Sequence, residues 1–186
     1  MSSILKVDEI QDTSGNNIIN ENAGTVTIGK AGNTTNIVGT LQNDGSGLIS
    51  GITEADQWRL TANITSNTDP ISSNLERNDS TGFGYVGTGM SVSSGIWTFP
   101  STGIYYVIYT LRGYPNTNYT IGGDIKVTTN NSTYTTVAEG TFGNNGDHSN
   151  QGTTSTFVDV TDTSNVKVKF TTNSMNAGSV VEGQTG

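Results

Sequence analysis

Short runs of β-branched residues, each closed by a glycine, characterise the first fifty positions of the chain. Thr25-Val26-Thr27-Ile28-Gly29 is followed ten residues later by Thr35-Asn36-Ile37-Val38-Gly39. This pattern predicts brief strands joined by tight turns. Strands this short and polar cannot bury a core within one chain, but they become stable when several copies wrap around one another. Residues 1–50 are therefore expected to form an attachment segment and an intertwined β stem.

The apolar residues of this segment mark its strands, and the polar stretches between them mark its turns. Turns are predicted at residues 14–17, 22–24 and 30–33, each of which contains Gly and Asn. The apolar residues assigned to the stem and to attachment are Leu5, Val7, Ile10, Val26, Ile28, Ile37 and Val38.

One helical signal follows, in Thr53-Glu54-Ala55-Asp56-Gln57-Trp58-Arg59-Leu60. Thr53 suits the N-cap of a helix, and the acidic Glu54 and Asp56 suit the positive end of the helix dipole. We expect one or two helical turns within a linker over residues 51–63. Trp58 would either tuck under the following domain or stack on a ligand.

From residue 64 onward the pattern consists of strands and turns only. The candidate strands cover residues 84–86, 95–99, 103–111, 124–128, 133–139, 154–160 and 165–171. The gaps between them are rich in Gly, Asn and Ser, and short strands at such spacing predict a sandwich or jelly roll. We therefore expect an all-β chain with a head over residues 64–186.

Composition supports this fold class and limits the partners of the chain. Only 31% of its 186 residues are hydrophobic, and Thr, Ser, Asn and Gly replace them, which suits strands and turns. Disorder is the competing interpretation of a polar chain, but here the apolar residues cluster and alternate. The net charge of −8 disfavours nucleic acid as a partner. No segment approaches the roughly 20 apolar residues that cross a bilayer, so no membrane insertion is expected.

The densest apolar segment covers residues 95–109. Trp97 and Phe99 share one face of a strand, and Tyr105, Val107 and Tyr109 share one face of the next. This segment resembles the signature of the complement and tumour-necrosis-factor jelly-roll family, in which an aromatic residue, an apolar residue two positions on, and Gly-aliphatic-Tyr open the central strands. Val158-Asp159-Val160 and Val166-Lys167-Val168-Lys169-Phe170 resemble the late strand pair of that family.

The resemblance implies a tight three-fold trimer with aromatic residues packed around its axis. An alternative stays open, because the same residues could fill the sandwich core of each subunit. The residues assigned to the trimer interface or the core are Trp97, Phe99, Tyr105, Val107, Tyr109, Phe157 and Phe170. The family closes with a further apolar strand, whereas this chain ends Glu182-Gly183-Gln184-Thr185-Gly186, so the head is expected to lack or replace its final strand and to leave a sheet edge unpaired.

Residues 5–16 follow the pattern Leu-Lys-Val-Asp-x-Ile-Gln-x-Thr-Ser-Gly-Asn. This pattern resembles the start of virion proteins from tailed phages of marine bacteria, cyanophages especially, and residues 51–60 are similar to the linker before a complement-like tip domain in those proteins. The resemblance implies a virion structural protein that is assembled in bacterial cytoplasm and released by lysis. Its amino-terminal segment would bind other virion proteins of the tail or capsid, and its head would form a homotrimer.

Enzyme signatures are absent from the sequence. His148 is the single histidine and there is no cysteine, which leaves no spacing typical of a metal site. A serine triad would need His148 as its base, and no Gly-x-Ser-x-Gly elbow precedes it. Asp159 and Asp162 flank a turn but lack the spacing of a calcium loop. We expect no enzymatic activity, no cofactor and no metal.

Two loops, residues 112–122 and 143–152, combine aromatic and polar groups, a mix that recognises sugars through stacking and hydrogen bonds. They could equally be ordinary solvated loops. The candidate receptor contacts are Arg112, Tyr114, Tyr119, Phe142 and His148.

Two functions from different classes follow. The leading hypothesis is a trimeric fibre or adhesin that binds a host cell-surface glycan by avidity. The alternative is a capsid decoration protein, seated close to the virion by a stem of about 50 residues, that stabilises the shell without a receptor. A glycan depolymerase comes third, since it would need paired carboxylates about 5–9 Å apart in a groove.

Overall fold

The computed structural model describes residues 9–11, 13, 17–22, 25–28, 32, 34, 42–43, 46–47, 51–115, 119–143 and 148–184. The chain divides into two units, residues 1–50 and 51–186, and each is described by itself. The regular structure of the described residues is β throughout, and the strand pairs are antiparallel. The predicted all-β class is confirmed.

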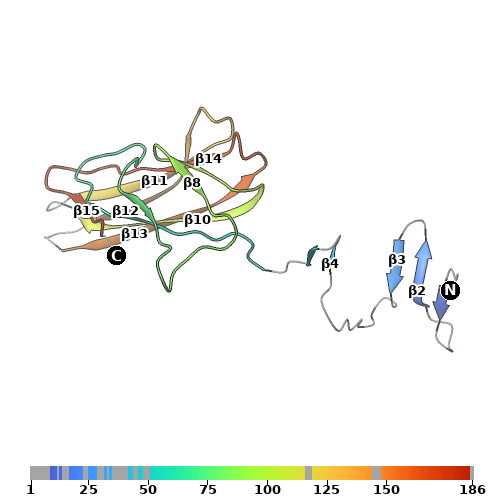
Figure 1. The fold of residues 1–186 in the computed structure, drawn as a ribbon. Coiled ribbons are helices and arrows are strands. Elements are labelled where there is room, and N and C mark those ends of the chain that lie inside the picture. The colour runs from blue at the N-terminus through green and yellow to red at the C-terminus, as the bar shows by residue number, and fades with distance from the viewer. Residues whose placement is uncertain are drawn as a thin grey trace. The chain divides into compact units, whose positions relative to one another are not determined.

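The first unit holds a three-stranded meander (Figure 1). Strand β1 (Glu9–Gln11) pairs with β2 (Asn17–Asn22), which pairs with β3 (Thr25–Ile28). Two further short strands, β4 (Gln42–Asn43) and β5 (Ser46–Gly47), form a separate pair. Of the predicted stem residues, Ile10, Val26 and Ile28 lie in these strands; Leu5, Val7, Ile37 and Val38 lie outside the described residues.

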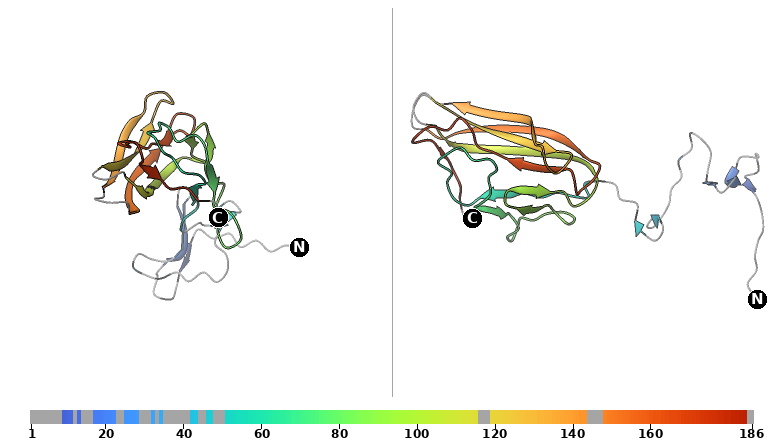
Figure 2. Two further views of the ribbon diagram at one scale, coloured as in Figure 1. Left: turned by 90° about the vertical axis from the view of Figure 1, so that its left-hand side faces the viewer. Right: turned by 90° about the horizontal axis from the view of Figure 1, so that it is seen from above.

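The second unit is a sandwich of two sheets, and Figures 1 and 2 show its layers. The larger sheet has the order β12-β11-β14-β9-β8. Its strands are β12 (Thr135–Gly143), β11 (Thr120–Thr128), β14 (Lys167–Phe170), β9 (Ile96–Thr98) and β8 (Ser91–Ser93). The smaller sheet has the order β13-β10-β15, with β13 (Asn150–Val160), β10 (Gly103–Tyr114) and β15 (Val180–Val181).

The core lies between the two sheets, because alternate residues of each strand point inward. Its main cluster consists of Trp97, Phe99, Ile125, Val158, Val160, Val166 and Val168. A second cluster consists of Leu111, Ile121, Phe142 and Val181. Strands β10 and β13 pair over eleven positions, from Gly103 opposite Val160 to Gly113 opposite Asn150, so they form a long, regular two-stranded platform.

The predicted helix within residues 51–63 was wrong. Trp58–Leu60 form strand β6, which pairs with β7 (Leu75–Arg77). Ala55 exchanges two backbone hydrogen bonds with Val86, at 3.1 and 2.8 Å. The segment is extended because partners distant in sequence take up its backbone groups.

The carboxyl-terminal part of the head carries a short last strand, where the sequence predicts a final strand that is missing or replaced. Strand β15 is only two residues long, but Val180 and Val181 are buried and pair with Gly113 and Tyr114 of β10. On the other side of β15, Ile64 and Val181 exchange two backbone hydrogen bonds of 2.9 Å. The predicted strand over residues 84–86 is reduced to the single bridge between Val86 and Ala55.

Candidate functional site

The outward face of β10 and β13 carries large apolar side chains in solvent. Ile104, Tyr106 and Ile108 of β10 are 68%, 58% and 56% exposed, and Phe157 of β13 is 73% exposed. Tyr106 and Phe157 are directly opposite each other across the strands, with ring centroids 5.0 Å apart. Ile104 and Ile108 are their diagonal neighbours on the same face. These four residues form one contiguous surface, named here the outward patch.

Hydroxyl groups accompany the outward patch. The Tyr106 hydroxyl donates a hydrogen bond to Ser155 Oγ at 2.9 Å. Four residues further along β10, the hydroxyls of Thr110 and Thr153 are 3.0 Å apart. The outward patch is therefore an apolar strip along β10 with polar neighbours, an arrangement typical of surfaces that bind another protein.

Most residues predicted as trimer interface or core lie on the opposite, inward side. Trp97 and Phe99 are 4% and 1% exposed, in the main core cluster. The others that pack against this cluster are Tyr105, Val107, Tyr109 and Phe170. Phe157 alone of the predicted set lies on the outward face. The alternation of side chains along the sequence separates two faces of β10. In the structure, one face packs against the core and consists of Tyr105, Val107 and Tyr109. The other face is exposed and consists of Ile104, Tyr106 and Ile108.

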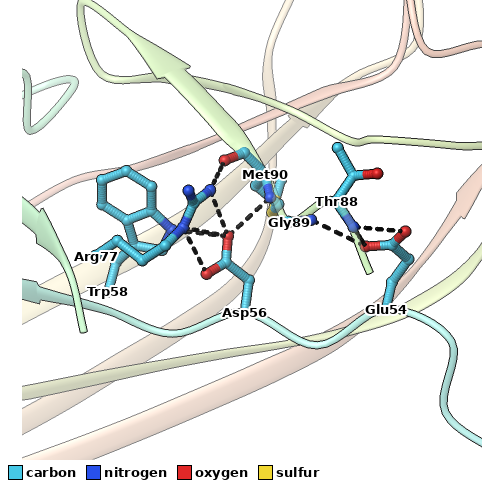
Figure 3. A network of polar contacts seen from close by, with 7 residues as sticks. All are labelled: Glu54, Asp56, Trp58, Arg77, Thr88, Gly89 and Met90. Carbon is cyan, nitrogen blue, oxygen red and sulfur yellow. Dashed lines mark hydrogen bonds and ion pairs between the residues drawn. The ribbon is translucent and has the colours of Figure 1, made fainter. Parts of the chain in front are cut away.

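A polar cluster fastens the beginning of the second unit to the sandwich (Figure 3). The Asp56 carboxylate accepts hydrogen bonds from Arg77 Nε at 3.0 Å, from Trp58 Nε1 at 2.9 Å and from the backbone amide of Met90 at 2.7 Å. Its side chain is only 6% exposed. Arg77 also donates to the carbonyl of Met90. This cluster, with Glu54 described next, is named the clamp.

Glu54 supplies the second carboxylate of the clamp (Figure 3). It accepts hydrogen bonds from the backbone amides of Thr88 and Gly89, both at 3.0 Å. Gly87 and Gly89 have φ of +76° and +72°, a conformation that L side chains rarely adopt, and it turns these amides toward the carboxylate. The backbone amides of Thr88 and Gly89 therefore bind the Glu54 carboxylate in the way that an anion-binding loop binds its ligand.

Aromatic rings connect the clamp to the core. The Arg77 guanidinium lies 4.7 Å from the ring centroids of both Trp58 and Tyr85, which is cation–π geometry. Trp58 in turn meets Trp97 edge-on, with centroids 4.8 Å apart. Two roles were expected for Trp58, packing under the head or stacking on a ligand, and in the structure Trp58 packs against the head.

The predicted receptor loops begin and end at the same end of the sandwich, because Thr120 pairs with Gly143 and Gly113 pairs with Asn150. Arg112, Tyr119 and His148 are exposed there, and Tyr114 is half-buried. Arg112 Nε lies 3.2 Å from a carboxylate oxygen of Glu182, a residue that sequence reasoning had not singled out.

Phe142 does not belong to this surface. It is 6% exposed and packs in the second core cluster, so the prediction that it contacts a receptor was wrong. Its strand, β12, alternates inward and outward positions up to its end, and Phe142 occupies an inward one.

The described residues contain no group of three or more His, Asp or Glu side chains placed to hold a metal ion. In the same part of the chain, no helix is long and apolar enough to cross a membrane.

Comparison with known proteins shows a jelly-roll fold like that of a tumour-necrosis-factor-type protein. The crystal structure of murine APRIL at pH 5.0 is similar, with a TM-score of 0.51 and 11% sequence identity, over 69% of this chain and 98% of that one. At this identity the likeness shows the fold alone, and it confirms the predicted jelly roll. No protein-family model matches the chain. No curated protein matches it either.

Proposed function

We propose that the chain is a non-enzymatic structural protein whose jelly-roll heads associate as a homotrimer through the outward patch. The observation that carries this proposal is the exposure of Ile104, Tyr106, Ile108 and Phe157, between 56% and 73%, on one continuous sheet face. Burying side chains of this size from such exposure contributes about 1–2 kcal/mol each. Contiguous apolar surface of this kind marks an interaction site.

Copies of the same chain are the partners that suit the outward patch. The resemblance of residues 95–109 to a family of three-fold trimers supports a trimer, and so does the expectation of an intertwined stem in residues 1–50. A closed cyclic assembly also covers the patch of every copy with no exposed apolar remainder.

The finer proposal is a phage virion protein that acts as a fibre or adhesin. The resemblance of residues 5–16 and 51–60 to virion proteins supports it. The amino-terminal segment would bind other virion proteins, and the head would bind a host glycan where Arg112, Tyr119 and His148 are exposed. Three weak sites on one axis would bind together by avidity.

Capsid decoration is the second candidate, and the length of the first unit favours it. A unit of about 50 residues gives the head a short reach from its attachment point. Immunogold electron microscopy of intact virions separates the two candidates: label on the tail or on projecting fibres supports the adhesin, and label spread evenly over the head supports decoration. The absence of label from every virion would overturn the virion proposal.

The trimer is tested by light scattering on the full chain and on two matched variants. The wild type should have three times the 19.5 kDa mass of one chain. Phe157→Ser should reduce the mass to that of a monomer. Phe83→Ser is the control, because Phe83 is similarly exposed, at 61%, but belongs to neither β10 nor β13. A monomeric wild type, or a Phe157→Ser variant that remains trimeric, would refute the proposal.

A further inference from the structure

Strands β1, β2 and β3 of the first unit place isoleucines in one row. Ile10 of β1 pairs with Ile19 of β2, and Ile19 pairs with Ile28 of β3. Residues that pair directly across antiparallel strands lie on the same face of the sheet. Their exposed fractions are 38%, 38% and 54%. An apolar row therefore runs across the whole sheet and faces solvent over much of its surface.

The row arises from a spacing of nine residues in the sequence. Ile10, Ile19 and Ile28 are nine positions apart, and Ile37 follows at the same spacing, outside the described residues. One strand and one turn together take up nine residues, so each new strand returns an isoleucine to the same register. A repeat that returns one isoleucine per strand to the same register gives the sheet one continuous apolar face.

A sheet this small needs cover on its apolar face. Its strands are three, six and four residues long. Sheets with so few and such short strands are marginal unless a second layer packs against them. Burying the exposed surface of each isoleucine contributes about 1 kcal/mol.

We infer that the isoleucine row is the contact through which the stems of neighbouring copies meet, with the three rows turned toward a common axis. The inference rests on the proposed trimer of heads. Once the heads associate, each first unit is held beside two identical units at a millimolar-scale effective concentration, far above that of any free partner. With each row lying along the three-fold axis, Ile10, Ile19 and Ile28 of each copy meet the same residues of the other two.

The absence of cysteine from the chain makes this inference directly testable. Ile19→Cys introduces a single thiol at the centre of the row in the full chain. Mild oxidation should link two of the three copies, about two thirds of the chains, because each disulfide joins two thiols and leaves the thiol of the third copy reduced. Disulfides form when Cα atoms are within about 7 Å, so the link reports close approach of the rows.

Thr13→Cys is the matched control, because Thr13 is exposed but lies outside the row. We expect its cross-linked fraction to be at least tenfold lower than that of Ile19→Cys. Adding Phe157→Ser to Ile19→Cys should abolish the link, since the stems are no longer held together. Ile19→Asn should raise hydrogen exchange of residues 17–28 at least tenfold in the trimer.

The outcomes separate this inference from the proposed function. A trimer in which Ile19→Cys stays reduced, as when another protein or a lipid covers the row, overturns the stem contact and leaves the head interface standing. Equal cross-linking of the two cysteine variants also overturns it. A monomeric chain refutes the proposed function itself.

Discussion

The Asp56 carboxylate and the Arg77 guanidinium form the centre of the clamp, with Arg77 Nε 3.0 Å from Asp56 Oδ1. Twenty-one positions separate them in the sequence. The pair joins the extended segment before β6 to β7, and the Trp58 ring carries the contact into the core at Trp97. The first residues of the second unit are thus held by the same packing that stabilises the sandwich.

Asp56→Ala should destabilise the second unit by about 2–3 kcal/mol, because it leaves the largely buried Arg77 without its counter-ion and the Met90 amide without its acceptor. The side chains of Asp56 and Arg77 are 6% and 23% exposed. Urea unfolding, followed through tryptophan fluorescence, measures the change, since Trp58 lies at the clamp.

Glu76→Gln is the control for that substitution. Glu76 pairs with Arg59 at 2.7 Å, but its side chain is 48% exposed and that of Arg59 is 30% exposed. Exposed pairs contribute roughly 0–1 kcal/mol. Equal effects of the two substitutions would contradict the central role of Asp56.

Acid should weaken the fold through Asp69. Burial raises the pKa of the Asp69 carboxyl, but hydrogen bonds and charges from Lys126 and Lys169 outweigh it and hold the pKa below its ordinary value of 3.8. The two ammonium groups lie 2.8 and 2.6 Å away. A carboxyl whose pKa is lowered by folding stabilises the protein above its unfolded pKa, and this stabilisation is lost as the pH falls through the folded pKa.

Asp69→Asn should therefore remove part of the acid dependence of unfolding. In urea titrations from about pH 6 down to pH 2, the variant should lose less stability than the wild type, with the difference arising below about pH 4. Asp79→Asn is the control, at an exposed carboxyl outside this ion-pair cluster, and it should leave the Lys126 and Lys169 contacts intact. If Asp69→Asn had the same pH profile as the wild type, the ion pairs would be without effect on stability.

Tyr109→Phe should cost about 1 kcal/mol, because the Tyr109 hydroxyl donates a hydrogen bond of 3.0 Å to the carbonyl of Thr171 beside the core. Burial, and then the Asp124 charge, raise the pKa of Tyr109. A raised pKa gives stability that is present below the ordinary value of 10.0 and is lost as the pH rises.

Tyr105→Phe, in the same strand, is the control for the cost of losing a buried hydroxyl. The Tyr105 hydroxyl also donates to a backbone carbonyl, that of Ser101 at 3.0 Å, but at an exposed position. We expect its loss to cost less than about 0.5 kcal/mol. In an absorbance titration, Tyr109→Phe should leave the ionisation of the folded protein below pH 11 unchanged, and a loss of signal in that range would contradict the burial of the hydroxyl.

The strands of the head followed from sequence because their apolar positions alternate between glycine-containing turns. Which face of β10 meets the core did not follow. Both faces carry large apolar side chains, Ile104, Tyr106 and Ile108 on one and Tyr105 and Val107 on the other, so alternation separates the faces without ranking them. Only the partner layer determines which face is buried.

The clamp was missed for a different reason. Glu54 and Asp56 were interpreted as residues of a helix amino terminus because carboxylates accept backbone N–H groups there. They do accept such groups, but from Thr88, Gly89 and Met90, more than thirty positions away. Local sequence carries no signal for partners at that distance.

Gly113→Ala should detach the last strand from the head. A Cβ at Gly113 would lie 3.0 Å from the carbonyl carbon of Val180 and 3.0 Å from the Cα of Val181, so β15 would have to move. Overpacking of this kind costs about 1–3 kcal/mol.

Gly84→Ala is the control, because a Cβ there meets nothing within 4 Å. Hydrogen exchange at the Val181 amide, which donates to the carbonyl of Ile64, should accelerate in Gly113→Ala and stay unchanged in Gly84→Ala. Unchanged exchange in both variants would show that β15 tolerates the added methyl group without leaving β10.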